Sequence, residues 1–417
     1  MTISTNIKCD VCGHTFTLKS QMDNSINLYN WPIAIVCPDC NNHLNLSMTS
    51  KGILPANFVC SETQDSTHVG YSATLPICHE IYYQHYPTLI TPFSSSFLNL
   101  YNLFGQKAVG DFGVSVSRIL SGIIPYRQAL KELHPLLIKK NVEAFLKKLA
   151  IVFNNKIETT TNENLDCFVI YFELIKTIYN GLQTDAYERQ KTGYFKELTN
   201  FIRNTSPDIL NEIISATDTF QNLDDWLEQK AFNYIANITA HLETYIPALF
   251  YSSIGNFVIP HTENLNILTI DYDQANDDYA TGFEILIKII PLIIALHNTM
   301  RNGNYNIYRE TGNETNNALA QLNNTFGGKR KEIVETYPDL RAYFEYTLDN
   351  HIRNGENHCD VTYDVITQTL SYKYNINNPN LIHTERLIDL CFRVYLQFMR
   401  IIEITTLIIT IKKKLHS

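Results

Sequence analysis

Two short cysteine motifs near the start of the chain constrain the fold more than any other feature of its 417 residues. The first is CDVC, with Cys9 and Cys12, and the second is CPDC, with Cys37 and Cys40, after an interval of 24 residues. A C-x-x-C turn holds two sulfurs at the spacing of ligands on one metal ion, and two such turns complete a tetrahedral zinc site. The sequence therefore predicts an N-terminal zinc ribbon, a small β-structure over residues 1–50 that holds a structural Zn²⁺ ion.

His14 and His43 follow the two motifs closely and are alternative ligands, although four thiolates suffice for one ion. A site closed by four sulfurs has no position for a reacting water, so we expect the metal to stabilise the fold. The alternative is four unrelated buried thiols. The remaining cysteines lack ligand spacing and are expected to be buried thiols, namely Cys60, Cys78, Cys167, Cys359 and Cys391.

Composition indicates a globular protein with two or three folding units, because 45% of the residues are hydrophobic and 18% are charged. The formal net charge is -9, so the chain as a whole does not attract polyanions. Contact with nucleic acid would therefore need a local basic patch, and the terminal IKKKLHS is the clearest basic run.

The polar first residues do not resemble a secretion leader, and we expect a cytoplasmic protein. The most apolar stretch, residues 283–300, is interrupted by Glu284, Lys288 and Pro291. Charged residues also interrupt the apolar C-terminal segment, namely Arg393, Arg400 and Glu403. We expect both stretches to be buried helices and predict no membrane association.

The pattern of apolar residues predicts a mainly α-helical chain after the ribbon. Residues 51–97 lack a helical period and suggest short strands or a connector, whereas apolar residues recur at helical spacing from residue 98 onward. The predicted domains are 1–50, the ribbon; 51–97, the connector; 98–277, a central helical domain; and 278–417, a C-terminal helical domain. Further helical stretches are predicted over 206–250, 278–300 and 313–325.

Near the C-terminus, the sequence predicts a helix, a β-hairpin and a last helix. Pro338 suits the first position of a helix whose Leu340, Phe344, Leu348 and Ile352 lie four apart on one stripe. The segments VTYD and TLSYKY then alternate polar and apolar residues, which indicates a hairpin. The last helix is predicted over residues 384–413.

Between that first helix and the hairpin stands RNGENH, which brings together Arg353, Asn354 and His358. A guanidinium matches phosphate and an imidazole titrates near neutrality, so the three side chains suit chemistry on a phosphodiester. The alternative is that they cap a helix C-terminus. Similar pairs occur elsewhere without this context: Arg127 with His134 lies inside a helical pattern, and Arg203–Asn204 and Arg301–Asn302 lack the following histidine.

RNGENH followed by TYDVITQTLSY resembles the HEPN superfamily of helical ribonucleases and nucleotide-binding domains. More closely, it resembles the C-terminal segment of bacterial proteins in which an R-N-x-x-x-H helix end precedes a Y-D-x-x-x-Q-x-aliphatic-x-Y hairpin. The resemblance covers about residues 278–415, and its hairpin positions are Tyr363, Asp364, Gln368, Leu370 and Tyr372. Glu356 and Asn357 stand where close relatives have small residues. Asp360 replaces a tyrosine of some members, which disfavours nucleotide transfer through that position.

The resemblance implies a HEPN-like C-terminal domain with a β-hairpin insertion that cleaves RNA without metal, in a cleft shared by two protomers of a homodimer. Arg353 would stabilise the phosphate charge, His358 would transfer a proton and Asn354 would orient one of them. Glu284 or Asp349 could support the site. Such a protein would be a toxin or phage-defence effector, triggered by a protein or nucleic acid at the ribbon or central helices.

The alternative function is a non-catalytic dimeric interaction or nucleotide-binding module, whose ribbon binds a macromolecular partner. A zinc hydrolase is disfavoured, because the four cysteines are used structurally and no H-E-x-x-H motif occurs.

Overall fold

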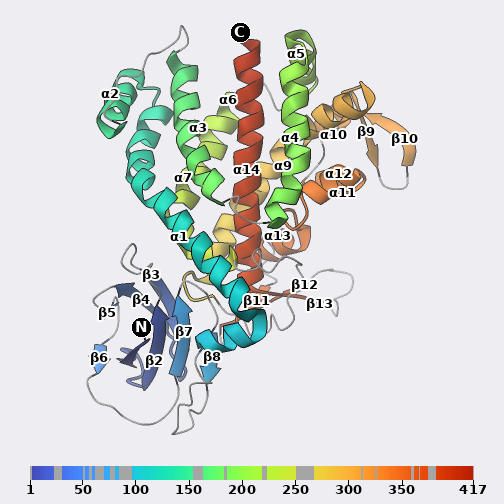
Figure 1. Cartoon of the computed structure of the whole chain (residues 1–417). Helices are drawn as coiled ribbons and strands as arrows, with labels where there is room; N and C mark the ends of the chain where they lie inside the picture. Colours follow the sequence, from blue (N-terminus) through green and yellow to red (C-terminus); the bar gives the residue numbers. More distant parts are fainter. Residues whose placement is uncertain are drawn as a thin grey trace. The chain divides into compact units, whose positions relative to one another are not determined.

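The structure is a computed structural model that describes the following residues: 2–22, 31–49, 52–55, 59–61, 70–75, 80–83, 96–153, 163–182, 186–217, 223–249, 267–310, 313–323, 325, 327–357, 361–365, 367–373 and 382–416. It is mainly helical, with small β-sheets and a cluster of four cysteines near the N-terminus (Figure 1). These coarse features of the predicted fold are confirmed. Cys78, Cys359, His358 and Asp360 lie outside the described residues.

The strands are β1 (Thr2–Lys8), β2 (Thr15–Met22), β3 (Trp31–Val36), β4 (His43–Thr49), β5 (Gly52–Pro55), β6 (Val59–Ser61), β7 (Gly70–Leu75), β8 (Glu80–Tyr83), β9 (Ile307–Glu310), β10 (Asn313–Ala318), β11 (Val361–Asp364), β12 (Thr369–Lys373) and β13 (Ile382–Arg386). The helices are α1 (Ser96–Ile138), α2 (Val142–Phe153), α3 (Glu163–Leu182), α4 (Ala186–Asn204), α5 (Pro207–Ala216), α6 (Leu223–Asp225), η4 (Trp226–Ala231), α7 (Phe232–Ala240), η5 (Leu242–Leu249), α9 (Tyr272–Asn302), α10 (Leu319–Asn323), α11 (Gly327–Glu335), α12 (Pro338–Tyr343), α13 (Asn350–Asn357) and α14 (Leu387–Leu415).

The chain forms two compact units, and each is assembled from segments that are distant in sequence. Unit 1 contains residues 1–121, 241–277 and 351–395, and unit 2 contains residues 122–240, 278–350 and 396–417. The four predicted domain ranges stay predictions, because a compact unit and an independently folding domain are different properties.

Unit 1 contains most of the β-structure. Strands β6-β1-β2-β7-β8 form one sheet in this order, β3-β4-β5 form a second, and β11-β12-β13 form a third. Neighbouring strands are antiparallel, except that β2 and β7 are parallel. Strand β3 buries alternate side chains, including Trp31 and Ile33, as a strand with one face on a core does. Strands β5 to β8 lie within residues 51–97, for which the sequence suggests short strands or a connector.

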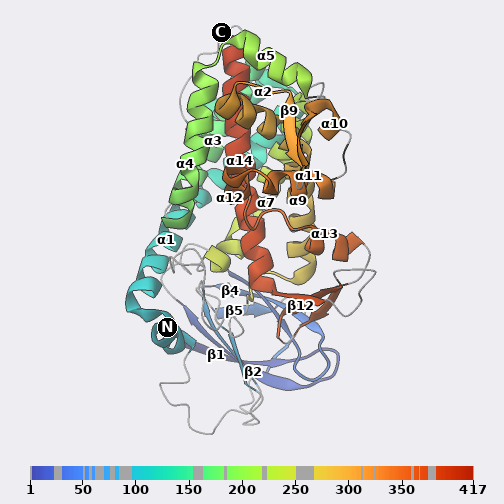
Figure 2. The same ribbon diagram turned by 90° about the vertical axis from the view of Figure 1, so that its right-hand side faces the viewer.

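Unit 2 is a bundle of helices (Figure 2), and its part of α14 is mostly buried as far as Ile411. Figure 1 shows α14 in the middle of this bundle, with α3 on one side and α4 on the other. Local sequence explains where α5 begins: Pro207 occupies its first turn, and the Ser206 hydroxyl accepts a hydrogen bond from the Ile209 N–H.

Among the residues that the structure describes, two helices, α9 and α14, are long and apolar enough to cross a membrane. However, 78% and 89% of their most apolar windows are buried inside the molecule. Core helices pass the same test of length and composition, so this feature does not by itself indicate a membrane protein.

The predicted helix from Pro338 is wrong as a single element. It is divided into α12 and α13, since the backbone leaves the helix after Tyr343 and Tyr346 adopts a positive φ of 64°. The predicted stripe nevertheless faces the interior, because Leu340, Phe344, Leu348 and Ile352 are all buried. Burial of apolar residues thus constrains the chain here even where the helix is broken.

Two further boundaries differ from the prediction. The first half of the predicted helix 313–325 is strand β10, which pairs with β9. The predicted last helix begins at Leu387, because residues 382–386 form β13 against β12. In both cases hydrogen bonds to a neighbouring strand decided the structure, and local pattern does not record such partners.

Candidate functional site

Both cysteine motifs fold into the same kind of tight turn. In the first, the Cys9 N–H donates to the His14 carbonyl, and the Gly13 N–H donates to the Cys9 carbonyl. In the second, Cys37 bonds in the same way to Asn42 and is bonded by the Asn41 N–H. Gly13 and Asn41 both have a positive φ, which glycine and asparagine adopt more readily than other residues. The residue after each second cysteine therefore allows the turn to close.

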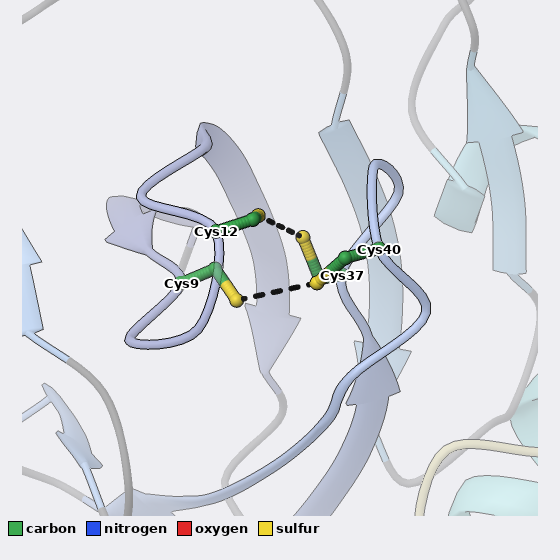
Figure 3. Close-up of side chains that lie close together, drawn as sticks. All are labelled: Cys9, Cys12, Cys37 and Cys40. Atoms are coloured by element: carbon green, nitrogen blue, oxygen red, sulfur yellow. Dashed lines mark hydrogen bonds between the residues drawn. The ribbon is translucent and has the colours of Figure 1, made fainter.

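The two turns bring the four sulfurs together, as Figure 3 shows. The Sγ atoms of Cys9 and Cys40 lie 3.7 Å apart, those of Cys12 and Cys37 lie 3.5 Å apart, and all four lie within 4.8 Å of one another. A tetrahedral zinc ion with Zn–S bonds of about 2.3 Å separates its sulfurs by about 3.8 Å. The predicted convergence of the four cysteines is confirmed, and its dimensions fit a metal ion.

The pKa values of the cysteine thiols also favour a bound cation. Burial raises the pKa of the Cys9 thiol, but backbone hydrogen bonds from Cys12 and Val11 outweigh this and lower it to about 7. The backbone at His14 lowers the pKa of Cys12, whereas desolvation and the other three cysteines raise it to about 12. The Cys9 thiol thus ionises readily, whereas ionisation of Cys12 beside it is unfavourable because it would add negative charge. A bound divalent cation would neutralise that charge.

Neither neighbouring histidine belongs to the group of four ligands. His14 is half-buried behind the first turn, and His43 is exposed at the start of β4. The Asn42 amide bridges the two turns, since its Nδ2 atom lies 3.9 Å from the Cys9 sulfur and donates to Asp10 at 3.2 Å. Asn42 was not predicted from the sequence, because a single asparagine carries no ligand spacing.

The predicted hairpin is confirmed: β11 and β12 pair from Val361 with Tyr372 to Asp364 with Thr369. Gln368 in its turn attaches the hairpin to the rest of unit 1. The Gln368 side chain accepts from the Ile267 N–H at 2.7 Å and donates to the Ile267 carbonyl at 2.8 Å. The next residue, Leu268, accepts a bond of 2.5 Å from Ala34 of β3. Residues 267 and 268 thus connect the β11–β12 hairpin with the β3-β4-β5 sheet.

The other motif positions of the hairpin also have structural roles. Tyr363 stacks on Tyr272 with the ring centres 5.0 Å apart, and Asp364 accepts a hydrogen bond from the Thr367 N–H. Leu370 and Tyr372 are fully buried. These five side chains hold the hairpin in position.

A small cavity lies beside this connection, between β3, the start of α9 and the hairpin. Its lining includes His43, Asp271, Tyr272 and Gln368. Its volume of about 30 Å³ admits water but is far below the roughly 300 Å³ of a small-molecule site. The cavity is therefore no candidate for a nucleotide pocket.

The predicted catalytic residues lie on and after α13. Ile352 anchors this short helix with a fully buried side chain, and the next residue, Arg353, is half-buried. Asn354 belongs to the same helix, whereas His358 and the side chain of Asn354 lie outside the described part of the chain. Their proximity therefore stays a prediction.

The two candidate supporting residues lie before α13 and on α9. Asp349 precedes α13, and its backbone N–H and carbonyl both bond to the Tyr279 hydroxyl, at 3.0 and 3.2 Å. Burial lowers the pKa of Arg330, and the charge of Glu284 on α9 opposes this in part. Neither contact involves the RNGENH segment.

His134 and Arg301, which belong to the similar residue pairs elsewhere in the sequence, have contacts of their own. His134 lies in α1, between the Tyr171 hydroxyl at 3.1 Å and the Asn233 side chain at 2.8 Å. Arg301 joins Glu197 and Asp339, each at 2.8 Å. Sequence spacing could not reveal this cluster, since its members come from α4, α9 and α12.

Comparison with protein-family models, with curated proteins and with solved structures finds no match to this chain.

Proposed function

We propose that this protein is a metal-independent endoribonuclease of the HEPN type. The proposal comes from the resemblance of RNGENH and its hairpin to that superfamily. The observation that supports it best is the context of Arg353, a half-buried cation on a short helix whose neighbour Ile352 is anchored in the core. A guanidinium at a helix surface offers a fork of donors that suits phosphate binding.

The proposed chemistry needs a base for a ribose 2'-hydroxyl, a proton donor for the leaving 5'-oxygen and positive charge near the phosphorane. His358 would move the proton, Arg353 would bind the phosphate oxygens and Asn354 would orient one of these groups. The Arg353, Asn354 and His358 side chains of one protomer supply too few catalytic groups, so two protomers would share one cleft in a homodimer. A toxin or phage-defence effector would use such an activity.

We further propose that the four-cysteine cluster holds zinc in a structural role. A site of four sulfurs fits Zn²⁺ in ligand type and spacing. All four positions are taken by protein ligands, so the ion would stabilise the ribbon and would not activate water.

The test of the nuclease proposal compares purified wild-type protein with His358→Ala and Arg353→Ala on tRNA and mRNA, without added metal. His351→Ala is the matched control, since His351 is a half-buried histidine on the same helix. We expect RNA cleavage by the wild type and the control, and a loss of at least about 10²-fold in the two site variants. Equal cleavage by His358→Ala, or none by the wild type, would favour the non-catalytic dimeric module.

A further inference from the structure

The four cysteines of the ribbon differ in their exposure to solvent. Cys9 and Cys37, the first cysteine of each turn, are at most 1% exposed. Cys12 and Cys40, the second cysteine of each turn, are exposed. A dissolved reagent therefore reaches one cysteine of each turn before it reaches the other.

Each exposed cysteine has a buried cysteine of the other turn as a close neighbour. A thiol–thiol hydrogen bond of 3.7 Å joins Cys40 to Cys9, and one of 3.5 Å joins Cys12 to Cys37 (Figure 3). A disulfide bond is about 2.05 Å long, so the two sulfurs of each pair need to approach by roughly 1.5 Å. Four sulfurs arranged around one small ion are thus also arranged for two disulfide bonds between the turns.

Exposure and a neighbouring thiol together distinguish a reactive cysteine from an inert one. Buried structural cysteines are inert, whereas redox-sensitive cysteines are exposed and have a second cysteine beside them that completes the reaction. Cys12 and Cys40 meet both conditions. Cys167 and Cys391 do not meet the first, because both are buried. Among these thiols, oxidation should therefore begin at the ribbon.

We propose that hydrogen peroxide converts the cluster into two disulfide bonds, Cys9–Cys40 and Cys12–Cys37, which we call the cross-turn bonds. The exposed thiolate of each pair attacks one peroxide oxygen, the O–O bond breaks, and hydroxide leaves with the electron pair of that bond. The product is a sulfenic acid on the exposed cysteine. The buried thiolate then attacks this sulfur and displaces a second hydroxide. Each pair loses two electrons to one peroxide, and two protons from solvent convert the hydroxides to water.

The cross-turn bonds replace the metal as the link between the two turns. A sulfur in a disulfide no longer carries the thiolate charge that binds a metal ion, so the ion leaves as the bonds form. The Cys9–Cys40 bond joins residues 31 apart in sequence, which restricts the unfolded chain as the ion does. A thiol reductant reverses both bonds. Release of the ion rests on the proposed zinc site, whereas the cross-turn bonds need only the thiols.

The test treats the full chain with hydrogen peroxide and maps its disulfide bonds by mass spectrometry without reduction. A protease that cleaves before aspartate cuts at Asp10 and Asp39, which separates the two cysteines of each motif. The peptides then distinguish the cross-turn bonds from bonds within one turn. We expect both cross-turn bonds, two peroxide molecules consumed and one zinc ion released to a metal-sensitive dye, while Cys167 and Cys391 stay reduced.

Two double variants test the role of the exposed thiols. Cys12→Ser/Cys37→Ser keeps one exposed and one buried thiol, and should still form the Cys9–Cys40 bond. The matched variant Cys12→Ser/Cys40→Ser also removes two thiols but keeps only the buried ones. It should react with peroxide at least about tenfold more slowly, because the attacking thiolate is no longer exposed.

Bonds within one turn, or equally fast oxidation of the buried cysteines outside the cluster, would overturn the proposal. The wild-type disulfide map gives this answer even if the double variants fold poorly. Cross-turn bonds in a protein that contains no zinc would reject the proposed zinc site and leave the oxidation standing. Zinc release without cross-turn bonds would have the opposite meaning.

Discussion

At the scale of single residues, Gln368 makes the contacts on which the hairpin of unit 1 depends. Its buried side chain bonds to both backbone groups of Ile267, while its own φ of 51° lies in the left-handed region. Gln368→Asn relieves that backbone conformation but is too short for both bonds. We expect unfolding free energy to fall by about 2–4 kcal/mol, because two buried backbone groups lose their partner.

Chemical denaturation of Gln368→Asn and of the exposed control Thr367→Ala measures this difference. If Gln368→Asn is as stable as Thr367→Ala, the hydrogen bonds to Ile267 contribute little to stability. The strain of the positive φ at Gln368 would then be the larger effect.

Two glycines of unit 2, Gly282 and Gly193, should respond in opposite ways to substitution by alanine. A Cβ on Gly282 would overlap the amide of Gln397 and lie 2.7 Å from the Tyr234 hydroxyl, whereas a Cβ on Gly193 meets open space. Gly282→Ala should destabilise the protein by about 1–3 kcal/mol through overpacking. Gly193→Ala, on a helix surface, should stabilise it by about 0.5–1 kcal/mol. Thermal unfolding measures the stability of both variants relative to the wild type. If both variants were stabilised, or both destabilised, the close packing around Gly282 would be contradicted.

At the scale of elements, α14 carries an ion pair in the core of unit 2. Arg400 donates to Glu403 at 2.6 Å and to the Tyr343 carbonyl at 2.9 Å, and its guanidinium lies 4.6 Å from the centre of the Tyr343 ring. Both charged side chains are at most 1% exposed. Removing one partner leaves a buried charge, so Glu403→Gln should cost about 3–5 kcal/mol.

The double variant Arg400→Met/Glu403→Leu should recover much of that loss, because it removes both charges. A double-mutant cycle in urea measures the coupling between the two residues. Additive effects of the single variants would indicate that the pair is not coupled in the folded protein.

At the scale of the whole molecule, stability should depend on pH through two imidazoles of unit 2, the half-buried His134 and the buried His297. Burial lowers the pKa of His134 against a rise from Asn233, and burial lowers that of His297 against a rise from Asp339. Both imidazoles therefore protonate more readily in the unfolded chain. Stability should be unaffected well above the ordinary value of about 6.5, and should fall as pH drops below it.

Melting temperatures at about pH 7.5 and about pH 5.5 test this dependence. The acid-induced decrease should be smaller in His134→Gln/His297→Gln than in the wild type. His416→Gln is the control, since His416 is exposed at the chain end. An equal decrease in all three proteins would assign the pH dependence to other groups.

Metal removal should act on the ribbon of unit 1. We expect one zinc ion per chain, lost with a chelator at acid pH, where protons compete for the thiolates. Cys40→Ser should lose the ion, whereas Cys167→Ser, a buried thiol outside the cluster, should retain it. Elemental analysis and limited proteolysis of the ribbon would measure both effects. A stable, metal-free wild-type ribbon would leave the cysteines as free thiols.

The local features of this protein could be predicted from its sequence, since their causes are local. The spacing of Cys9, Cys12, Cys37 and Cys40 predicts their convergence, because each turn is closed by neighbouring backbone bonds. Alternation predicts the hairpin of β11 and β12, because side chains on a strand point to opposite faces in turn.

Only the tertiary structure decided the features that depend on distant partners. Strands β10 and β13 replace predicted helix because a neighbouring strand takes up their hydrogen bonds. The helix from Pro338 breaks at Tyr343, whose carbonyl accepts a bond from Arg400. Gln368 bonds to Ile267 across 101 residues of sequence. Sequence periodicity reports which face of an element is buried, whereas the identity of the partner depends on how the whole chain packs.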